Sequence, residues 1–251
     1  MKTIILRTDD IHRGNLILVN QEHSYQEQHV VLCTVGTWEG ADILYERTAA
    51  AALNKLIQEI GGAGQIVPVS AWRSLAEQQK IWEDSLAEHG LEFTQSYVAV
   101  PGHSEHQTGL AIDLALNQPQ IDFICPCFPY EGICQRFRQK AAEYGFIERY
   151  QEDKQAVTGI GHEPWHFRYV GIPHAAMMTQ RGMALEEYIE FIKAYRYGEN
   201  PYIVEGKYKE QYAVSYIKAN AAGQAAEIAV NDRRQYSISG NNCDGFIVSI
   251  K

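Results

Sequence analysis

Positive charge is scarce in this 251-residue chain. It has 22 Lys and Arg residues against 31 Asp and Glu residues, which gives a formal net charge of -9, and it has no long block of Lys or Arg. Nucleic acids and anionic membranes attract basic surfaces, so this charge balance argues against both as partners. Any anionic substrate must therefore be met by basic groups placed locally.

A long apolar run near the N-terminus is also lacking. Residues 4–6 are apolar, but charged residues follow at once, and this run is too short for a signal-peptide core or a membrane span. The five cysteines are odd in number and suit a reducing compartment better than a disulfide framework. We therefore expect a cytoplasmic protein without a membrane anchor.

Apolar residues, in contrast, make up 45% of the chain, which is enough for one substantial core with or without a small appendage. Apolar residues at helical spacing, together with a capping box at Ser74 and Glu77, predict several helices. β-prone runs between turn residues predict strands. The helices are expected at 45–60, 74–90, 133–144, 173–180 and 185–195, and the strands at 15–20, 66–70, from about 109, 146–150 and 165–170. We expect an α+β fold with a central, largely antiparallel sheet and helices packed against it.

The sequence changes in character after a break at residues 198–201. Short β-prone runs at 212–217, 226–230 and 246–250 follow, separated by Asn- and Gly-rich turns, and this part has no histidine. We predict a main domain over residues 1–197 and a small β-rich C-terminal appendage over residues 201–251. We assign the appendage no chemistry; packing or homo-oligomer formation is its default role.

One carboxylate stands in an otherwise apolar segment, because Asp113 has apolar neighbours on both sides. Removing a carboxylate from water costs several kcal/mol unless it is paired or coordinates a cation. A strand beginning near Gly109 would place Asp113 on one face beside two small alanines, which leaves room for a ligand. His106 lies just upstream, so a bound cation explains this placement most simply.

A second polar cluster at residues 161–170 offers His166 and Glu163 just before a β-prone run. Two imidazoles and one carboxylate form a catalytic zinc set that leaves a fourth position for water. Either cluster by itself is more often made of hydrogen-bonded loop residues than of metal ligands. The two clusters together, in this order, are much more specific.

His162 and His166 also match the pattern His-Glu-x-x-His, in which both histidines bind zinc from one helix and the Glu is the base. That arrangement needs an uninterrupted helix, whereas Pro164 has no N–H and disfavours the helical conformation at Glu163. With an extended Glu163 and a strand after it, His162 and His166 should not converge. The expected metal ligands are therefore His106, Asp113 and His166.

Three cysteines, Cys125, Cys127 and Cys134, lie in or just after a long irregular segment. They raise the possibility of a structural zinc site. Cys-x-Cys is not the usual Cys-x-x-Cys spacing, however, and no fourth ligand follows closely. We expect free thiols that pack a loop.

The sequence contains the motifs Ser104-x-His106-x-x-Gly109-x-Ala111-x-Asp113, Glu163-Pro-Trp-His166 and Pro-Val-Ser-x-x-Arg73-Ser-x-x-x-Gln78. These motifs resemble the signature of the zinc D-alanyl-D-alanine peptidases of vancomycin resistance, the VanX, VanY and VanXY group. The resemblance is strongest to the bifunctional VanXY enzymes and covers roughly residues 15–195. The same fold occurs in Hedgehog signalling domains, so the resemblance implies a D-Ala-D-Ala peptidase/Hedgehog-like fold.

The resemblance also implies roles for single residues. Zinc is the implied cofactor, Glu163 the general base, and Arg73 the group that stabilises negative charge on the substrate carbonyl. Ser104 and Gln78 are implied to bind the terminal D-alanine of the substrate. Residues 71–72 are Ala-Trp where relatives commonly have Gly-Tyr, so the contacts beside Arg73 are expected to differ in detail.

The implied activity is hydrolysis of D-Ala-D-Ala and removal of the terminal D-Ala from peptidoglycan precursor pentapeptides, which gives vancomycin resistance. These peptides are the expected partners. The alternative is a zinc-dependent binding module of the same fold without peptidase activity. A binding module has no need for both a base and an oxyanion donor, so the presence of Glu163 with Arg73 favours the enzyme.

Overall fold

The structure is a computed structural model that describes residues 1–207, 209–220 and 225–251. Residues 208 and 221–224, which belong to the expected C-terminal appendage, lie outside the described residues. The chain divides into two compact units, one formed by Val19–Ala175 and the other by Met1–Leu18 with Ala176–Lys251. In the described part of the chain, every helix is too short or too polar to span a membrane.

The larger unit contains a four-stranded antiparallel sheet, which confirms the expected α+β class. A two-stranded hairpin, β2 with β3, precedes it in the chain. In sheet order the four strands are β4 (Ile66–Ser70), β5 (Ala111–Leu116), β7 (Glu163–Tyr169) and β6 (Phe146–Tyr150), and the hairpin strands are β2 (Leu32–Trp38) and β3 (Ala41–Glu46).

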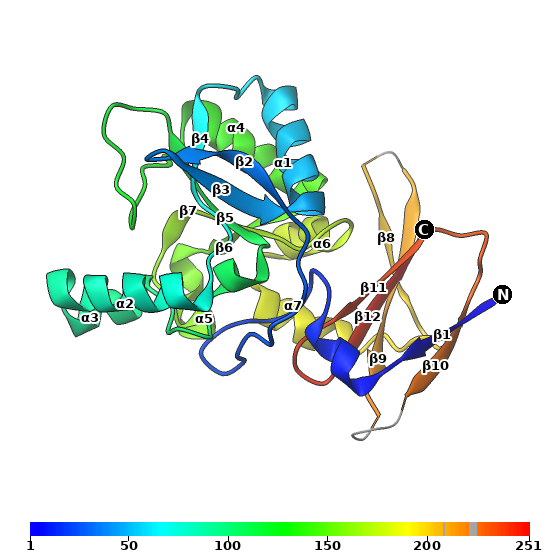
Figure 1. Ribbon diagram of the computed structural model, residues 1–251. Helices are drawn as coiled ribbons and strands as arrows, with labels where there is room; N and C mark the ends of the chain where they lie inside the picture. The colour runs from blue at the N-terminus through cyan, green and yellow to red at the C-terminus, as the bar shows by residue number, and fades with distance from the viewer. Residues whose placement is uncertain (208, 221–224) are drawn as a thin grey trace. The chain divides into compact units, whose positions relative to one another are not determined.

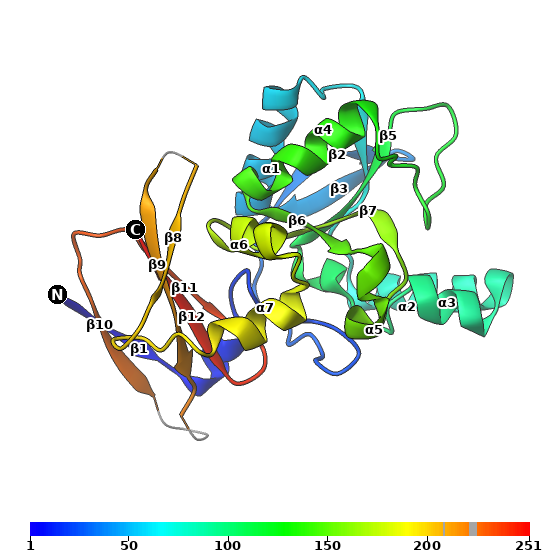
Figure 2. The ribbon, with the colours of Figure 1, turned by 180° about the vertical axis from the view of Figure 1, so that it is seen from behind.

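The helices of this unit lie on both sides of the sheet: α1 and α4 on one side, and α2, α3 and α5 on the other (Figures 1 and 2). Leu53 and Leu56 of α1 and Phe137 of α4 share one buried core with Ile112 and Phe167 of the sheet. The helices are α1 (Arg47–Ile60), α2 (Leu75–His89), α3 (Leu91–Tyr97), α4 (Gly132–Ala141) and α5 (Gln155–Thr158), and the 3-10 turns are η2 (Glu105–Thr108), η3 (Ala142–Tyr144) and η4 (Glu152–Lys154).

Local sequence signals set the ends of these helices. The Ser74 hydroxyl accepts from the Glu77 backbone N–H at 3.2 Å and the Glu77 carboxylate accepts from the Ser74 N–H at 2.7 Å, so the expected capping box is confirmed. Helix α1 begins after Glu46, whose carboxylate accepts from two backbone N–H groups, and ends at Gly61 with φ 67°.

Strand alternation separates a core face from a polar face of the sheet. Ile112 of β5 pairs with Phe167 of β7, and both belong to the buried core. The next pair in the register is Asp113 with His166, whose side chains therefore lie on the opposite face. The fold thus brings together two polar residues that are 53 positions apart in the sequence.

The second unit is mostly β. A four-stranded sheet has the order β11-β12-β9-β8, and the N-terminal strand β1 pairs antiparallel with β10. Leu6 of β1 packs in one core with Val230 and Phe246. The elements are β1 (Lys2–Leu6), η1 (Thr8–His12), α7 (Leu185–Ile192), β8 (Tyr202–Glu205), β9 (Gln211–Lys218), β10 (Ala226–Val230), β11 (Tyr236–Gly240) and β12 (Gly245–Ile250), while α6 (His174–Arg181) begins just before the boundary.

Two expectations differ from this arrangement. The strand expected at residues 15–20 is wrong: the segment is buried but irregular, because Leu16 N–H donates to the Ser239 hydroxyl and Leu18 N–H donates to the Asn241 carbonyl instead of forming a ladder. The expected division near residue 198 also differs from the grouping in the structure, because β1 pairs with β10 and so places the N-terminus with the C-terminal strands.

Candidate active site

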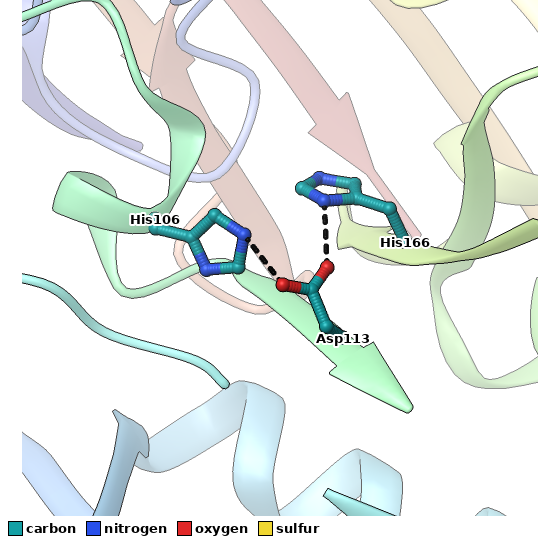
Figure 3. A group of neighbouring side chains, drawn as sticks. All are labelled: His106, Asp113 and His166. Atoms are coloured by element: carbon teal, nitrogen blue, oxygen red, sulfur yellow. Dashed lines mark hydrogen bonds and ion pairs between the residues drawn. The ribbon is translucent and has the colours of Figure 1, made fainter. Parts of the chain in front are cut away.

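The structure brings together the three residues expected to bind a metal. Asp113 comes from β5, His166 from β7 and His106 from the turn η2, and all three are buried (Figure 3). One potential ligand atom from each lies within 4.8 Å of the others. The two Asp113 oxygens are divided between the histidines: Oδ2 lies 3.1 Å from His106 Nε2 and Oδ1 lies 3.0 Å from His166 Nδ1.

Backbone geometry fixes His106 in this position. The turn η2 ends at Gly109 with φ 73°, a conformation that glycine adopts without strain, and β5 begins two residues later. The other ring nitrogen, Nδ1, lies 2.6 Å from the Ala71 carbonyl oxygen. A carbonyl only accepts, so Nδ1 carries the proton and the lone pair of neutral His106 is on Nε2.

This hydrogen-bond pattern fits a bound cation. The Nε2 lone pair of His106 faces a carboxylate oxygen of Asp113 at 3.1 Å, so two acceptors meet unless a proton or a metal ion lies between them. Burial first, and then the positive charge of Arg73, lower the pKa of His106 to about 4, so His106 is neutral at pH 7. Two neutral imidazoles and a carboxylate are the donor types that zinc prefers.

Two further residues with expected roles lie at the same place. The Glu163 carboxylate, from the first residue of β7, has Oε2 3.6 Å from His166 Nδ1 and is 7% exposed. Arg73 donates from Nη2 to Asp113 Oδ2 at 2.9 Å and from Nε to the Ser70 hydroxyl at 2.8 Å. A carboxylate and a guanidinium therefore flank the three candidate ligands.

The buried charges shift one another's protonation. Burial, with the negative charge of Asp113 in addition, raises the pKa of Glu163 to about 8 despite the opposing effect of His166. Burial lowers the pKa of His166, but hydrogen bonds to Asp113 and Glu105 outweigh it and raise this pKa to about 9. Burial raises the pKa of Asp113, but the two histidines hold it well below its usual range. A cation at the site would favour the deprotonated form of each group.

The site opens into a small cavity of about 30 Å³. Ser104 lines this cavity, and its hydroxyl oxygen accepts from the His106 backbone N–H at 3.3 Å. Gln78 is completely buried behind it: its amide donates to the Ala99 carbonyl at 2.8 Å, and its oxygen lies 3.5 Å from Arg73 Nη1. Phe123, Tyr150 and Trp165 supply apolar wall, a contribution that the sequence motifs did not indicate.

A second cavity of about 680 Å³ adjoins the first, because Val98, Ala99, Tyr150 and Ile160 line both. Its remaining wall includes Gln95 of α3 and other polar residues of that helix. A volume of this size is in the range of pockets that bind small molecules or short peptides.

The alternative zinc geometry is not formed. Glu163–Tyr169 is a strand, which confirms the expected extended conformation at Glu163. His162 lies outside the group of candidate ligands, and its Nε2 is 2.8 Å from the Tyr130 hydroxyl. Among the described residues there is one group of possible metal ligands, and it does not include the loop cysteines, which form no disulfide.

Sequence reasoning also overlooked a charged residue of the site, Glu105. It lies inside the matched motif, but its partners Arg149 and Arg168 are 44 and 63 positions away. The sequence offered one signal, a Glu directly before a candidate ligand, and that signal carried no information on burial.

A model of the family VanY, D-alanyl-D-alanine carboxypeptidase, matches residues 42–172. The bifunctional D-Ala-D-Ala dipeptidase and D-Ala-D-Ala carboxypeptidase VanXYC of Enterococcus gallinarum is 41% identical over 184 residues, which are 71% of this chain and 95% of that protein. These matches confirm the resemblance to the VanX and VanY group.

Solved structures agree with this relationship. The vancomycin-resistance D,D-dipeptidase VanXYg, in complex with a D-Ala-D-Ala phosphinate analogue, superposes with a TM-score of 0.94 at 47% identity over 99% of this chain and 98% of its own. A mutant of the D,D-pentapeptidase VanY from a VanB-type resistance cassette, in complex with Zn(II), superposes with a TM-score of 0.56 at 30% identity over 70% of this chain and 98% of its own. The chain is a member of the VanY family of D-alanyl-D-alanine carboxypeptidases.

Proposed function

We propose that this protein is a zinc-dependent D,D-peptidase that hydrolyses D-Ala-D-Ala and removes the terminal D-Ala from peptidoglycan precursor pentapeptides, and so gives resistance to vancomycin. The observation that carries the proposal is the convergence of three buried ligand-type side chains beside Glu163 and Arg73. Family membership adds the substrate class, because the relative VanXYC is named for both activities.

The proposed zinc ligands are His106, Asp113 and His166. When bound there, zinc would supply Lewis-acid chemistry, polarising the scissile carbonyl and acidifying a water molecule. The paired acceptors His106 Nε2 and Asp113 Oδ2 support this assignment, because a cation between them removes their repulsion.

Glu163 is the proposed general base. Its carboxylate lines the cavity and reaches the same ring nitrogen of His166 that faces Asp113. A carboxylate with a raised pKa can take a proton from the attacking water and pass it to the leaving amine near neutral pH. A binding module of the same fold would gain nothing from this buried carboxylate.

Arg73 is the proposed donor to the oxyanion that forms on the substrate carbonyl. Its guanidinium is partly buried, and Asp113 and Ser70 accept hydrogen bonds from its Nη2 and Nε, so its orientation is fixed before substrate binds. Removing a preorganised donor of this kind typically costs about 3 to 4 kcal/mol of transition-state stabilisation.

Ser104 and Gln78 are the proposed contacts to the terminal D-alanine. The Ser104 hydroxyl lines the cavity and can donate as well as accept. Gln78 does not line the cavity; its amide N–H donates to the Ala99 carbonyl, and its amide oxygen lies near Arg73 Nη1. Its expected contact with substrate stays a prediction.

The adjoining cavity supports action on longer peptides as well as on the dipeptide. Its volume of about 680 Å³ and the wall residues that it shares with the catalytic cavity suit a peptidyl chain that extends from the scissile bond.

We also infer that the protein meets these precursors in the cytoplasm, where its five free cysteines would stay reduced. Cell fractionation tests the location.

Steady-state kinetics on a set of peptides test the proposed function. We expect zinc-dependent hydrolysis of D-Ala-D-Ala and of pentapeptides that end in it, weak action on D-Ala-D-lactate and D-Ala-D-Ser, and essentially none on L-Ala-L-Ala, with all activity lost to a chelator. Comparable rates on L-Ala-L-Ala would refute D,D specificity. Activity on the dipeptide alone would refute only the carboxypeptidase part.

A further inference from the structure

Glu105 has two carboxylate oxygens in different surroundings. Oε1 accepts from Arg149 Nε at 2.9 Å and from Arg168 Nη1 at 2.7 Å, and the side chains of all three residues are 0% exposed. Oε2 is turned the other way and lies 3.5 Å from His166 Nε2. The residue therefore connects a buried arginine pair to one of the candidate zinc ligands.

Glu105 Oε2 and His166 Nε2 are both buried, and neither forms a well-aligned hydrogen bond within the described part of the chain. Leaving both unpaired would be costly. A carboxylate held by two guanidinium groups is charged and can only accept, so Nε2 of His166 must be the donor.

The proton on Nε2 determines what the other ring nitrogen can do. Nδ1 of His166 faces Asp113 Oδ1 at 3.0 Å and Glu163 Oε2 at 3.6 Å. In the neutral ring with Nε2 protonated, the lone pair is on Nδ1 and points into this group. His106 has the opposite arrangement, because its Nδ1 faces the Ala71 carbonyl and its Nε2 faces Asp113.

We propose that Glu105 is a positioning residue that holds His166 in the Nε2–H tautomer and directs the Nδ1 lone pair at the metal, an inference that rests on the proposed zinc site. Arg149 of β6 and Arg168 of β7 both donate to Oε1. The carboxylate therefore cannot turn away from the imidazole of His166. Carboxylates in this position commonly strengthen metal binding by about 10- to 100-fold.

Glu105→Gln is the decisive variant, because it keeps the shape of the side chain. The amide oxygen can still accept from Arg149 and Arg168, while the amide NH₂ then meets Nε2 and favours the wrong tautomer of His166. We expect zinc affinity to fall by about 10- to 100-fold, measured on the full chain by competition with a chromophoric chelator.

Arg149→Met is the matched control, because it removes one contact to Oε1 but leaves Oε2 facing His166. Its melting temperature should fall while its zinc affinity stays near that of the wild type. Equal zinc affinity in Glu105→Gln and wild type would overturn the proposal, as would an equal loss in both variants. A wild-type chain that binds no zinc would instead refute the proposed function.

Long-range ¹⁵N–¹H NMR of histidine-labelled wild-type protein gives a readout that needs no variant. With zinc bound, we expect the non-exchanging proton of His166 on Nε2 and the shift of a metal-bound nitrogen at Nδ1. The reverse assignment would overturn the proposal even if Glu105→Gln failed to fold.

Discussion

The four ring nitrogens of His106 and His166 face three residues, which differ in what they do for the site. A backbone carbonyl at Ala71 and a carboxylate at Glu105 each face the outer nitrogen of one ring, while both inner nitrogens face Asp113. With the outer nitrogens protonated, both inner lone pairs converge on one carboxylate. This convergence is the physical reason for expecting a cation.

Glu163→Gln tests the proposed base at the scale of one residue. The substitution removes a carboxylate that lies beside the ligands without being one of them, so zinc content should not change. Because general-base catalysis typically contributes about 10²- to 10⁴-fold, kcat for D-Ala-D-Ala should fall by at least the lower of these factors. The zinc content and the rate of D-alanine release are measured on the same preparation. Near-normal turnover would show that Glu163 is not the general base.

The raised pKa values of Glu163 and His166 predict how the stability of the metal-free protein depends on pH. A group with a raised folded pKa stabilises the fold while protonated, and that stabilisation is lost as pH rises through the folded value. The folded values are about 8 for Glu163 and about 9 for His166, above the ordinary 4.5 and 6.5. The lowered pKa of His106, about 4, acts in the opposite sense, but only below about pH 6.5.

The metal-free protein should therefore lose stability between about pH 6.5 and 9, with a fall in melting temperature on the order of 5 °C. Calorimetry of the chelator-treated protein over this pH range measures the melting temperature. Glu163→Gln, which cannot titrate, should show a shallower decline. A melting temperature that rises with pH would contradict the charges assigned to this site.

The motifs predicted that the ligand residues lie together, but they did not predict the ion pairs around them. Asp113 was conspicuous because a carboxylate in an apolar strand needs a partner. The ion pair of Arg73 with Asp113 joins residues 40 positions apart, and the bonds of Glu105 join still more distant ones. No local pattern encodes such contacts, since they depend on which strands pair.

At the scale of elements, β5 and β7 build the site through their register. Pairing of Asp113 with His166 puts both on the polar face, whereas a slip of either strand by one residue would turn that strand's ligand to the core. Periodicity and capping predicted α1, α2 and these strands, because their signals are local. The strand expected at 15–20 was wrong because an apolar run indicates burial but does not identify hydrogen-bond partners. Strand β1 was missed because its partner β10 is over 200 positions away in the sequence.

Helix α3 carries a prediction on substrate scope, because Gln95 lines the larger cavity but not the catalytic one. Gln95→Trp should fill part of that cavity and lower kcat/KM for a pentapeptide by roughly tenfold, a cost of about 1.4 kcal/mol. Hydrolysis of D-Ala-D-Ala should stay at the wild-type rate, and Gln95→Ala is the control that leaves the cavity open. An equal loss on both substrates would show that the larger cavity does not hold the peptidyl chain.

At the scale of the whole molecule, the proposed machinery belongs to one unit. Every residue with a proposed role lies within Val19–Ala175, and the family match at residues 42–172 falls in the same unit. The strands outside it are shared with VanXYg, whose structure covers 99% of the chain, and we assign them no chemistry. The N-terminal strand β1 belongs with them, so removal of residues 201–251 alone would leave β1 without β10.

Zinc content of the purified chain tests the central claim most directly. We predict about one zinc per chain in the wild type and in His162→Ala, whose imidazole lies outside the ligand group, and essentially none in His106→Ala or Asp113→Ala. Circular dichroism of each variant confirms that it is folded. Zinc that is lost from His162→Ala and retained by folded His106→Ala and Asp113→Ala would contradict the assignment of the site.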